Sequence, residues 1–167
     1  MRLGTKVVLP VLLLVSALLR GSAAQPAQTS LEAPLVKAEE VVKLLKASKG
    51  AKPLILQVGF RVLYEQAHIP GSEYVAAASE LQGVEALRRR LKSVPRGKTI
   101  ILYCGCCPWV KCPNVQPAFR VLRDMGFTNV KLLYIAKNFG ADWVDQGYPV
   151  EKSDAKNASS QDGGTTR

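Results

Sequence analysis

Short apolar runs alternate with longer amphipathic segments through the middle of this 167-residue chain. The runs have the length of β-strands, and the segments between them place apolar side chains at helical spacing. Strands joined by helical crossovers pair in parallel, with right-handed connections. The sequence therefore predicts an α/β fold with a central, mostly parallel sheet. The expected strands are 54–58, 99–103 and 130–135, and the expected helices are 36–47, 79–92 and 117–125.

Local signals mark where several elements should begin and end. Ser79 and Asn114 are placed to cap the second and third helices, and Gly126 is placed to end the third. Pro70-Gly71 predicts a turn, and Tyr74-Val75 predicts a short strand after it.

The first 24 residues have the pattern of an export signal. Basic residues precede an apolar stretch from Val7 to Leu19, and small residues follow it up to Ala24. The stretch is shorter than the roughly 20 residues that span a bilayer, and Pro10 interrupts it. We therefore expect cleavage of residues 1–24 as a signal peptide. The mature protein is then periplasmic or secreted, without a membrane anchor.

The remaining chain divides into a linker, one domain and a tail. Residues 25–34 are rich in Pro, Ala, Ser and Thr, which is typical of a linker. Residues 35–151 carry the alternating elements and are enough for one ordinary domain. Residues 152–167 have almost nothing to bury, and we expect them to form a disordered tail.

The formal net charge of +10 limits the classes of partner. The basic residues are scattered through several segments and are not gathered with aromatic residues on one. An exported protein also rarely meets nucleic acid. We therefore expect no nucleic-acid partner, while attraction of a small anionic substrate fits the charge.

All four cysteines lie within nine residues, directly after the apolar run 99–103. Open parallel sheets bind their ligands at the carboxyl ends of strands, and Cys104 falls at such an end. Cysteines of exported proteins also tend to oxidise unless something keeps them reduced. The cluster is therefore the first candidate for chemistry; its members are Cys104, Cys106, Cys107 and Cys112.

Several segments follow one another in the order seen in a known family. They are Leu54-Ile55-Leu56-Gln57-Val58, Ala67-His68-Ile69-Pro70-Gly71-Ser72, Ile101-Leu102-Tyr103-Cys104, Gly126-Phe127, Asn129-Val130-Lys131-Leu132, Trp143 and Gly147-Tyr148-Pro149-Val150. Over about residues 35–151 the chain resembles a rhodanese-like domain, and the resemblance implies helices on both faces of the sheet.

The resemblance implies sulfur transfer at Cys104. In that family the cysteine begins a tight loop whose backbone amides, here those of Gly105 to Trp109, stabilise the anionic sulfur. Amides and a helix amino terminus favour the thiolate, which is the nucleophilic form. Cys104 would take sulfane sulfur from a small anionic donor such as thiosulfate, hold it as a persulfide and pass it to a thiol or cyanide-like acceptor. We expect no cofactor for this chemistry.

The loop departs from the usual sulfurtransferase pattern. Trp109 stands where an arginine is usual, and Lys111 is the nearest cation that can guide an anionic donor. In the second-strand signature, Gln57 replaces an acidic residue and Gly59 replaces an arginine, with Arg61 close by. The loop is also longer than usual and contains three extra cysteines.

Thiol-disulfide exchange is the first alternative. Cys104 and Cys107 have C-x-x-C spacing at a strand-to-helix junction. Attack by Cys104 and resolution by Cys106, Cys107 or Cys112 would be a redox reaction of the same cluster. A neighbouring thiol could also release the sulfur of a persulfide and leave a disulfide behind.

Metal binding and a structural disulfide are the remaining alternatives. The four thiolates are candidate ligands for a soft ion such as Cu(I), although their spacing is awkward for tetrahedral zinc. A disulfide between Cys112 and either Cys106 or Cys107 would instead pin the enlarged loop. His68, the only histidine, lies in a turn segment that the resemblance identifies as structural.

Overall fold

The computed structural model describes residues 33–153. The predicted export signal, most of the predicted linker and the chain after residue 153 lie outside this range. No helix among the described residues is long and apolar enough to cross a membrane.

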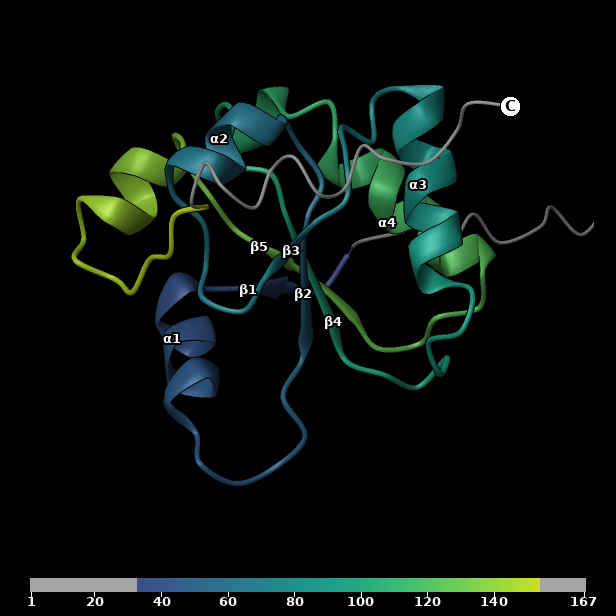
Figure 1. Cartoon of the computed structure of the whole chain (residues 1–167), viewed down its shortest axis with the longest axis horizontal. Helices are drawn as coiled ribbons and strands as arrows, with labels where there is room; N and C mark the ends of the chain where they lie inside the picture. Colours follow the sequence, from purple (N-terminus) through teal and green to yellow (C-terminus); the bar gives the residue numbers. More distant parts are fainter. Residues whose placement is uncertain (1–32, 154–167) are drawn as a thin grey trace, which may run out of the picture. The chain divides into compact units, whose positions relative to one another are not determined.

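One sheet of five strands, all paired in parallel, organises the domain (Figure 1). The strand order is β1-β5-β4-β2-β3, so β4 is the central strand. This arrangement confirms the predicted α/β class and parallel sheet. The strands are β1 (Leu35–Val36), β2 (Leu54–Gln57), β3 (Glu73–Tyr74), β4 (Ile100–Tyr103) and β5 (Val130–Leu133).

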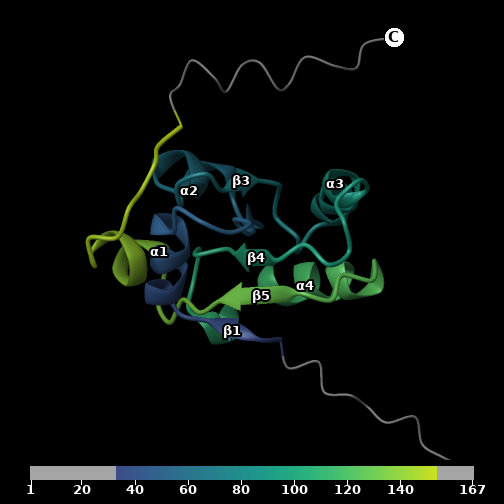
Figure 2. The same ribbon diagram turned by 90° about the horizontal axis from the view of Figure 1, so that it is seen from below.

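Helices cover both faces of the sheet, as the resemblance implies (Figures 1 and 2). The α-helices are α1 (Ala38–Lys46), α2 (Arg61–Gln66), α3 (Leu81–Leu91) and α4 (Val115–Asp124). A 3₁₀ turn over Trp109–Lys111 follows the end of β4, and a π-helical turn over Gly140–Val144 follows β5.

Successive residues of the central strands point to opposite faces and build two core layers. Ile100 and Leu102 belong to the layer covered by α3 and α4. Ile101 and Tyr103 belong to the other layer, with residues of α1 and the π-helical turn. All four are at most 1% exposed, so β4 is buried on both faces. Its carboxyl end is consequently held in place from both sides.

Several element boundaries differ from the sequence-based expectation. The first helix begins at Ala38 because Val36 belongs to β1 and pairs with Leu133. The second helix begins at Leu81 with Glu80 in the N-cap position, so the predicted Ser79 cap is wrong by one residue. The stop at Gly126 is confirmed by its φ of 84°.

Neither α2 nor the π-helical turn is predicted by the sequence pattern. The helix α2 has six residues and none of them is buried, so it has no apolar stripe to detect. The π-helical turn is five residues long and begins at Gly140, and only its Trp143 is buried.

The turn around His68 closes the domain near its carboxyl end. His68 exchanges backbone hydrogen bonds with Glu151, and its Nδ1 donates to the carbonyl of Tyr64 at 2.7 Å. Its ring also stacks on the Tyr64 ring, with centroids 3.8 Å apart. These contacts give the only histidine a structural role.

Close packing at α3 yields a test of the fold. A Cβ on Gly83 would lie 1.9 Å from the Ala77 carbonyl oxygen, so Gly83→Ala forces the helix and this backbone apart. We expect a loss of about 1–3 kcal/mol in unfolding free energy, measured by urea denaturation. Gly97→Ala is the matched control, because nothing lies within 4 Å of a Cβ there. Equal urea midpoints for the two variants would contradict this packing.

Candidate functional site

Cys104 is the first residue after β4, and its side chain is 2% exposed. The chain after β2 packs directly against its sulfur, since a Cβ on Gly59 would lie 2.6 Å from Cys104 Sγ. Gln57 Nε2 donates to the Cys104 carbonyl at 3.2 Å, and its Oε1 accepts from the Gly59 amide at 3.1 Å. The sulfur thus occupies space that a side chain at position 59 would need, which accounts for glycine there.

The loop after Cys104 turns away sharply at Gly105. This residue has a φ of 78°, and a Cβ on it would lie 2.6 Å from Phe139 Cβ. The Phe139 amide donates to the Gly105 carbonyl at 3.0 Å. Because both conformation and space exclude a larger residue, glycine is required at this turn.

The loop returns to the site at Cys112, just before α4. Asn114 occupies the N-cap position of this helix, and Val115 is its first residue. The backbone amides of Asn114 and Val115 lower the pKa of the Cys112 thiol. A helix leaves its first amides without partners inside the helix, so these donors are available to an anion.

The Asn114 side chain joins the two ends of the loop. It is 0% exposed, its Nδ2 donates to Cys104 Sγ at 3.3 Å, and its Oδ1 accepts from the Ser79 amide at 2.9 Å. The side chain therefore does not cap α4, contrary to the expectation for Asn114. The sequence signal that could have pointed to a role for Asn114 at the site is its position at the start of a predicted helix, two residues after Cys112. The contact with Ser79 is tertiary, so spacing could not reveal it.

The two cysteines at the ends of the loop hold one charge between them. The neighbouring Cys104 thiol and the backbone amides of Asn114 and Val115 lower the pKa of Cys112 to about 5. The hydrogen bond to Cys112, followed by burial, raises the pKa of Cys104 above its ordinary range. Two negative charges this close would repel each other, so the pair keeps one proton at neutral pH.

Cys104 nevertheless has donors that suit an anionic sulfur. Asn114 Nδ2 and the Cys106 amide both donate to it. When the charge moves from Cys112 to Cys104, these groups are already in place to stabilise it, without reorganisation of the loop.

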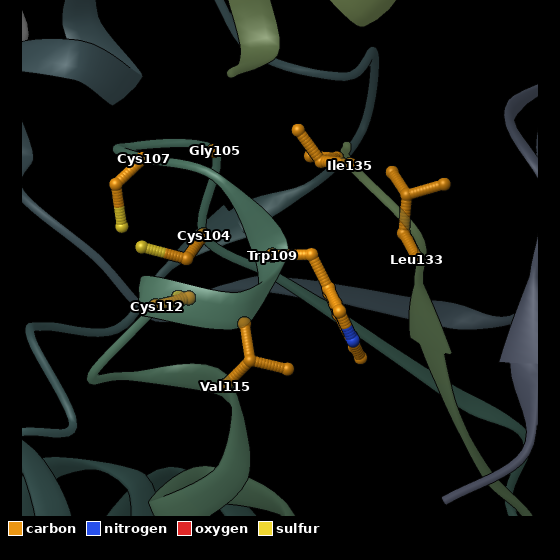
Figure 3. A pocket seen from close by; sticks show the side chains of 8 residues that line it. All are labelled: Cys104, Gly105, Cys107, Trp109, Cys112, Val115, Leu133 and Ile135. Atoms are coloured by element: carbon orange, nitrogen blue, oxygen red, sulfur yellow. The ribbon is translucent and has the colours of Figure 1, made fainter. Parts of the chain in front are cut away.

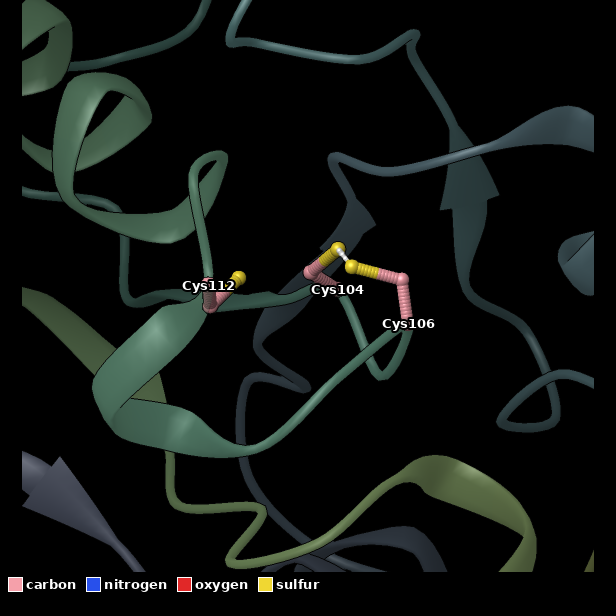
Figure 4. A group of neighbouring side chains, drawn as sticks. All are labelled: Cys104, Cys106 and Cys112. Atoms are coloured by element: carbon pink, nitrogen blue, oxygen red, sulfur yellow. Dashed lines mark hydrogen bonds between the residues drawn. The ribbon is translucent and has the colours of Figure 1, made fainter.

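The remaining cysteines lie beside this pair. Cys106 Sγ is 3.3 Å from Cys104 Sγ and 3.1 Å from Cys107 Sγ, and all four cysteines are free thiols. The sulfurs of Cys104, Cys106 and Cys112 lie within 4.8 Å of one another (Figure 4). Three converging thiolates can hold a soft metal ion such as Cu(I).

A small cavity adjoins the sulfurs (Figure 3). About 10 Å³ is open to the centre of a water-sized molecule, enough for a single heavy atom. None of its lining side chains is a carboxylate or a cation; the lining residues are Cys104, Gly105, Cys107, Trp109, Cys112, Val115, Leu133 and Ile135.

A larger groove of about 390 Å³ reaches the other side of the loop, at Gly105 and Cys106. It is also lined by residues of α2 and of the π-helical turn, and none of its lining residues is acidic. These are the elements that the sequence did not indicate. A molecule of substrate size fits this groove but not the small cavity.

The residues expected to contact an anion lie in different settings. Trp109 lines the small cavity and packs on Tyr134, with ring centroids 5.6 Å apart. Lys111 is exposed and does not line the cavity. The Arg61 guanidinium lies over the Tyr74 ring, 4.6 Å from its centroid.

In a comparison with protein families, the model of the rhodanese-like domain matches residues 37–134, which are more than half of the chain. The chain belongs to the rhodanese-like domain family. This confirms the resemblance drawn from the sequence motifs. Because the family includes sulfurtransferases, membership supports sulfur transfer as the class of chemistry.

Solved structures share this rhodanese fold. A crystal structure of the Alr3790 protein from Anabaena sp. matches with a TM-score of 0.54 and 24% identity, covering 71% of this chain and 82% of that one. The solution structure of the rhodanese-like domain of the same protein has a TM-score of 0.54 and 24% identity, covering 80% and 87%. A comparison with curated protein sequences gives no match.

The rhodanese fold also matches part of EanB. A structure of an EanB persulfide with ergothioneine has a TM-score of 0.50 and 24% identity, and covers 71% of this chain and 28% of EanB. An EanB variant in complex with hercynine has a TM-score of 0.51 and 23% identity, covering 72% and 28%. The match thus concerns about a quarter of EanB and shows a shared fold.

Proposed function

We propose that this rhodanese-like domain transfers sulfane sulfur through a persulfide on Cys104. The observation that carries the proposal is the setting of Cys104 Sγ. It lies at the carboxyl end of the central strand, with N–H donors from Asn114 and Cys106 and an atom-sized cavity beside it. A persulfide adds one sulfur atom and carries negative charge, so it needs both the space and the donors.

Loading of the site begins with a proton transfer between the two paired cysteines. The Cys104 thiol gives its proton to the Cys112 thiolate and becomes the nucleophile. Cys104 then attacks the sulfane sulfur of thiosulfate, the sulfur–sulfur bond of the donor breaks, and sulfite leaves with the electron pair. An acceptor such as cyanide or a thiolate next attacks the outer sulfur and restores the Cys104 thiolate.

The surroundings fit a small anionic donor. Neither the cavity nor the groove has an acidic lining residue, and the chain carries a net charge of +10. The groove gives the donor room beside the loop. In this proposal the exposed Lys111 attracts the anion from solution and the backbone amides of Gly105, Cys106 and Cys107 receive it, since Pro108 has no N–H and the Trp109 amide donates to the Ala136 carbonyl.

Intact mass spectrometry tests the persulfide. After a brief incubation with thiosulfate, before the added sulfur is released, the wild-type protein should gain one sulfur atom, and it should yield thiocyanate when cyanide follows. Cys104→Ser should abolish both results, because it removes the nucleophile. The other three cysteines serve as the internal control in that variant, since nonspecific sulfur addition would persist there. Equal sulfur gain in the two proteins would contradict the proposal.

We propose in addition that the protein works outside the cytoplasm, in the periplasm or as a secreted protein. Support comes from the signal pattern of residues 1–24, which lie outside the described residues. The same intact-mass measurement tests this on protein recovered from an export-competent host. The mature chain should begin at Gln25, and a chain that retains Met1 would contradict export.

Soft-metal binding is a second candidate function. Its support is the convergence of three sulfurs, those of Cys104, Cys106 and Cys112, within 4.8 Å of one another. Thiolates from one short loop suit Cu(I), which accepts fewer ligands than zinc does. Such a protein would deliver or sense the ion.

Anaerobic titration of the reduced protein with Cu(I) tests this candidate. One ion per chain should bind to the wild-type protein, and Cys106→Ser should weaken binding at least tenfold because it removes one of three ligands. Cys107→Ser is the matched control, since Cys107 lies outside the group of three. No stoichiometric copper in the wild-type protein, or equal affinity in all variants, would contradict it.

A further inference from the structure

We propose that Cys112 resolves the Cys104 persulfide, so that the site releases the sulfur as hydrosulfide and leaves a Cys104–Cys112 disulfide. The inference rests on the proposed function, because it starts from the loaded Cys104. It adds a second activity, persulfide reduction, that needs no external acceptor to release the sulfur.

The first support is the placement of the two sulfurs. Cys104 and Cys112 line the same cavity, and their sulfurs lie within 4.8 Å of each other. A persulfide on Cys104 extends into that cavity because the other side of the sulfur is closed by Gly59. The bound sulfur and Cys112 therefore share one small space, which Cys107 also lines.

The second support is the set of donors around Cys112. Cys112 lies just before α4, whose first amides, those of Asn114 and Val115, have no partner inside the helix and can stabilise an anionic sulfur. A thiolate is the form that attacks sulfur–sulfur bonds. These donors distinguish Cys112 from a cysteine that merely fills space at the loop end.

The third support is the different exposure of the two cysteines. Cys104 is buried, whereas Cys112 is half-buried. An external reductant can therefore reach the disulfide from the Cys112 side. Restoration of the dithiol needs a reductant of the dithiol class, which attacks Cys112 and frees Cys104.

The step balances without any other reactant. The Cys112 sulfur forms a bond to Cys104 Sγ, and the bond from Cys104 Sγ to the outer sulfur breaks. The outer sulfur takes the electron pair and is reduced by two electrons, while the two cysteines together lose two. The proton that Cys112 accepted during loading leaves on the outer sulfur as hydrosulfide.

A single-turnover experiment without reductant tests the inference. Reduced wild-type protein and Cys112→Ser are each mixed with thiosulfate, and both the released hydrosulfide and the intact mass are followed. The wild-type protein should release about one hydrosulfide per chain and reach the mass of a disulfide. Cys112→Ser lacks the proton acceptor of the loading step, so it is loaded at alkaline pH, where the Cys104 thiol ionises without that acceptor. It should then keep the added sulfur and release at least tenfold less hydrosulfide, because its persulfide has lost the resolving thiol.

Cys106→Ser tests whether Cys106 is the resolving cysteine instead of Cys112, since its sulfur lies 3.3 Å from that of Cys104. In this variant, peptide mapping should still find the Cys104–Cys112 disulfide. Release that depends on Cys106 but not on Cys112 would overturn the inference. So would equal release from the wild-type protein and from Cys112→Ser, although a persulfide formed in both would leave the proposed function standing. If the wild-type protein gains no sulfur and releases no hydrosulfide, the proposed function fails, and this inference fails with it.

Discussion

The site depends on the N–H donors that the junction of β4 and α4 brings around two sulfur atoms. The Asn114 side chain and the Cys106 amide serve Cys104, while the amides of Asn114 and Val115 serve Cys112. The two sulfurs are close enough to share one proton and one negative charge. Either sulfur can therefore carry the charge without a movement of the backbone.

The surrounding structure keeps this arrangement in place. The strand β4 is buried on both faces. The Gln57 side chain donates to the Cys104 carbonyl after β4 and accepts from the Gly59 amide after β2, so it joins the ends of these two strands. Asn114 in turn links the start of α4 to Ser79, just before α3. The loop between Cys104 and Cys112 can thus be long and partly exposed, because its two ends are fixed independently of its middle.

Sequence patterns were enough for the parallel sheet, for the main helices and for the placement of Cys104 at the end of a strand. These features depend on local periodicity and on chain order, which a sequence displays directly. The roles of Asn114 and Gly59 could not be predicted, because each depends on a residue distant in the sequence. Asn114 fits the pattern of a helix cap, and only the packed chain shows its side chain turned toward Cys104. Likewise, α2 and the π-helical turn have too few buried residues to leave a pattern, although both line the groove.

A crystal structure of the reduced protein, soaked briefly in thiosulfate, tests the central claim most directly. Additional density for one sulfur atom bonded to Cys104 Sγ is expected, within the cavity that Trp109 and Cys112 line. In Cys112→Ser crystals this density should persist on longer soaking, because the resolving thiol is absent. Added sulfur on Cys106, Cys107 or Cys112, with Cys104 unmodified, would contradict the assignment of Cys104 as the sulfur carrier.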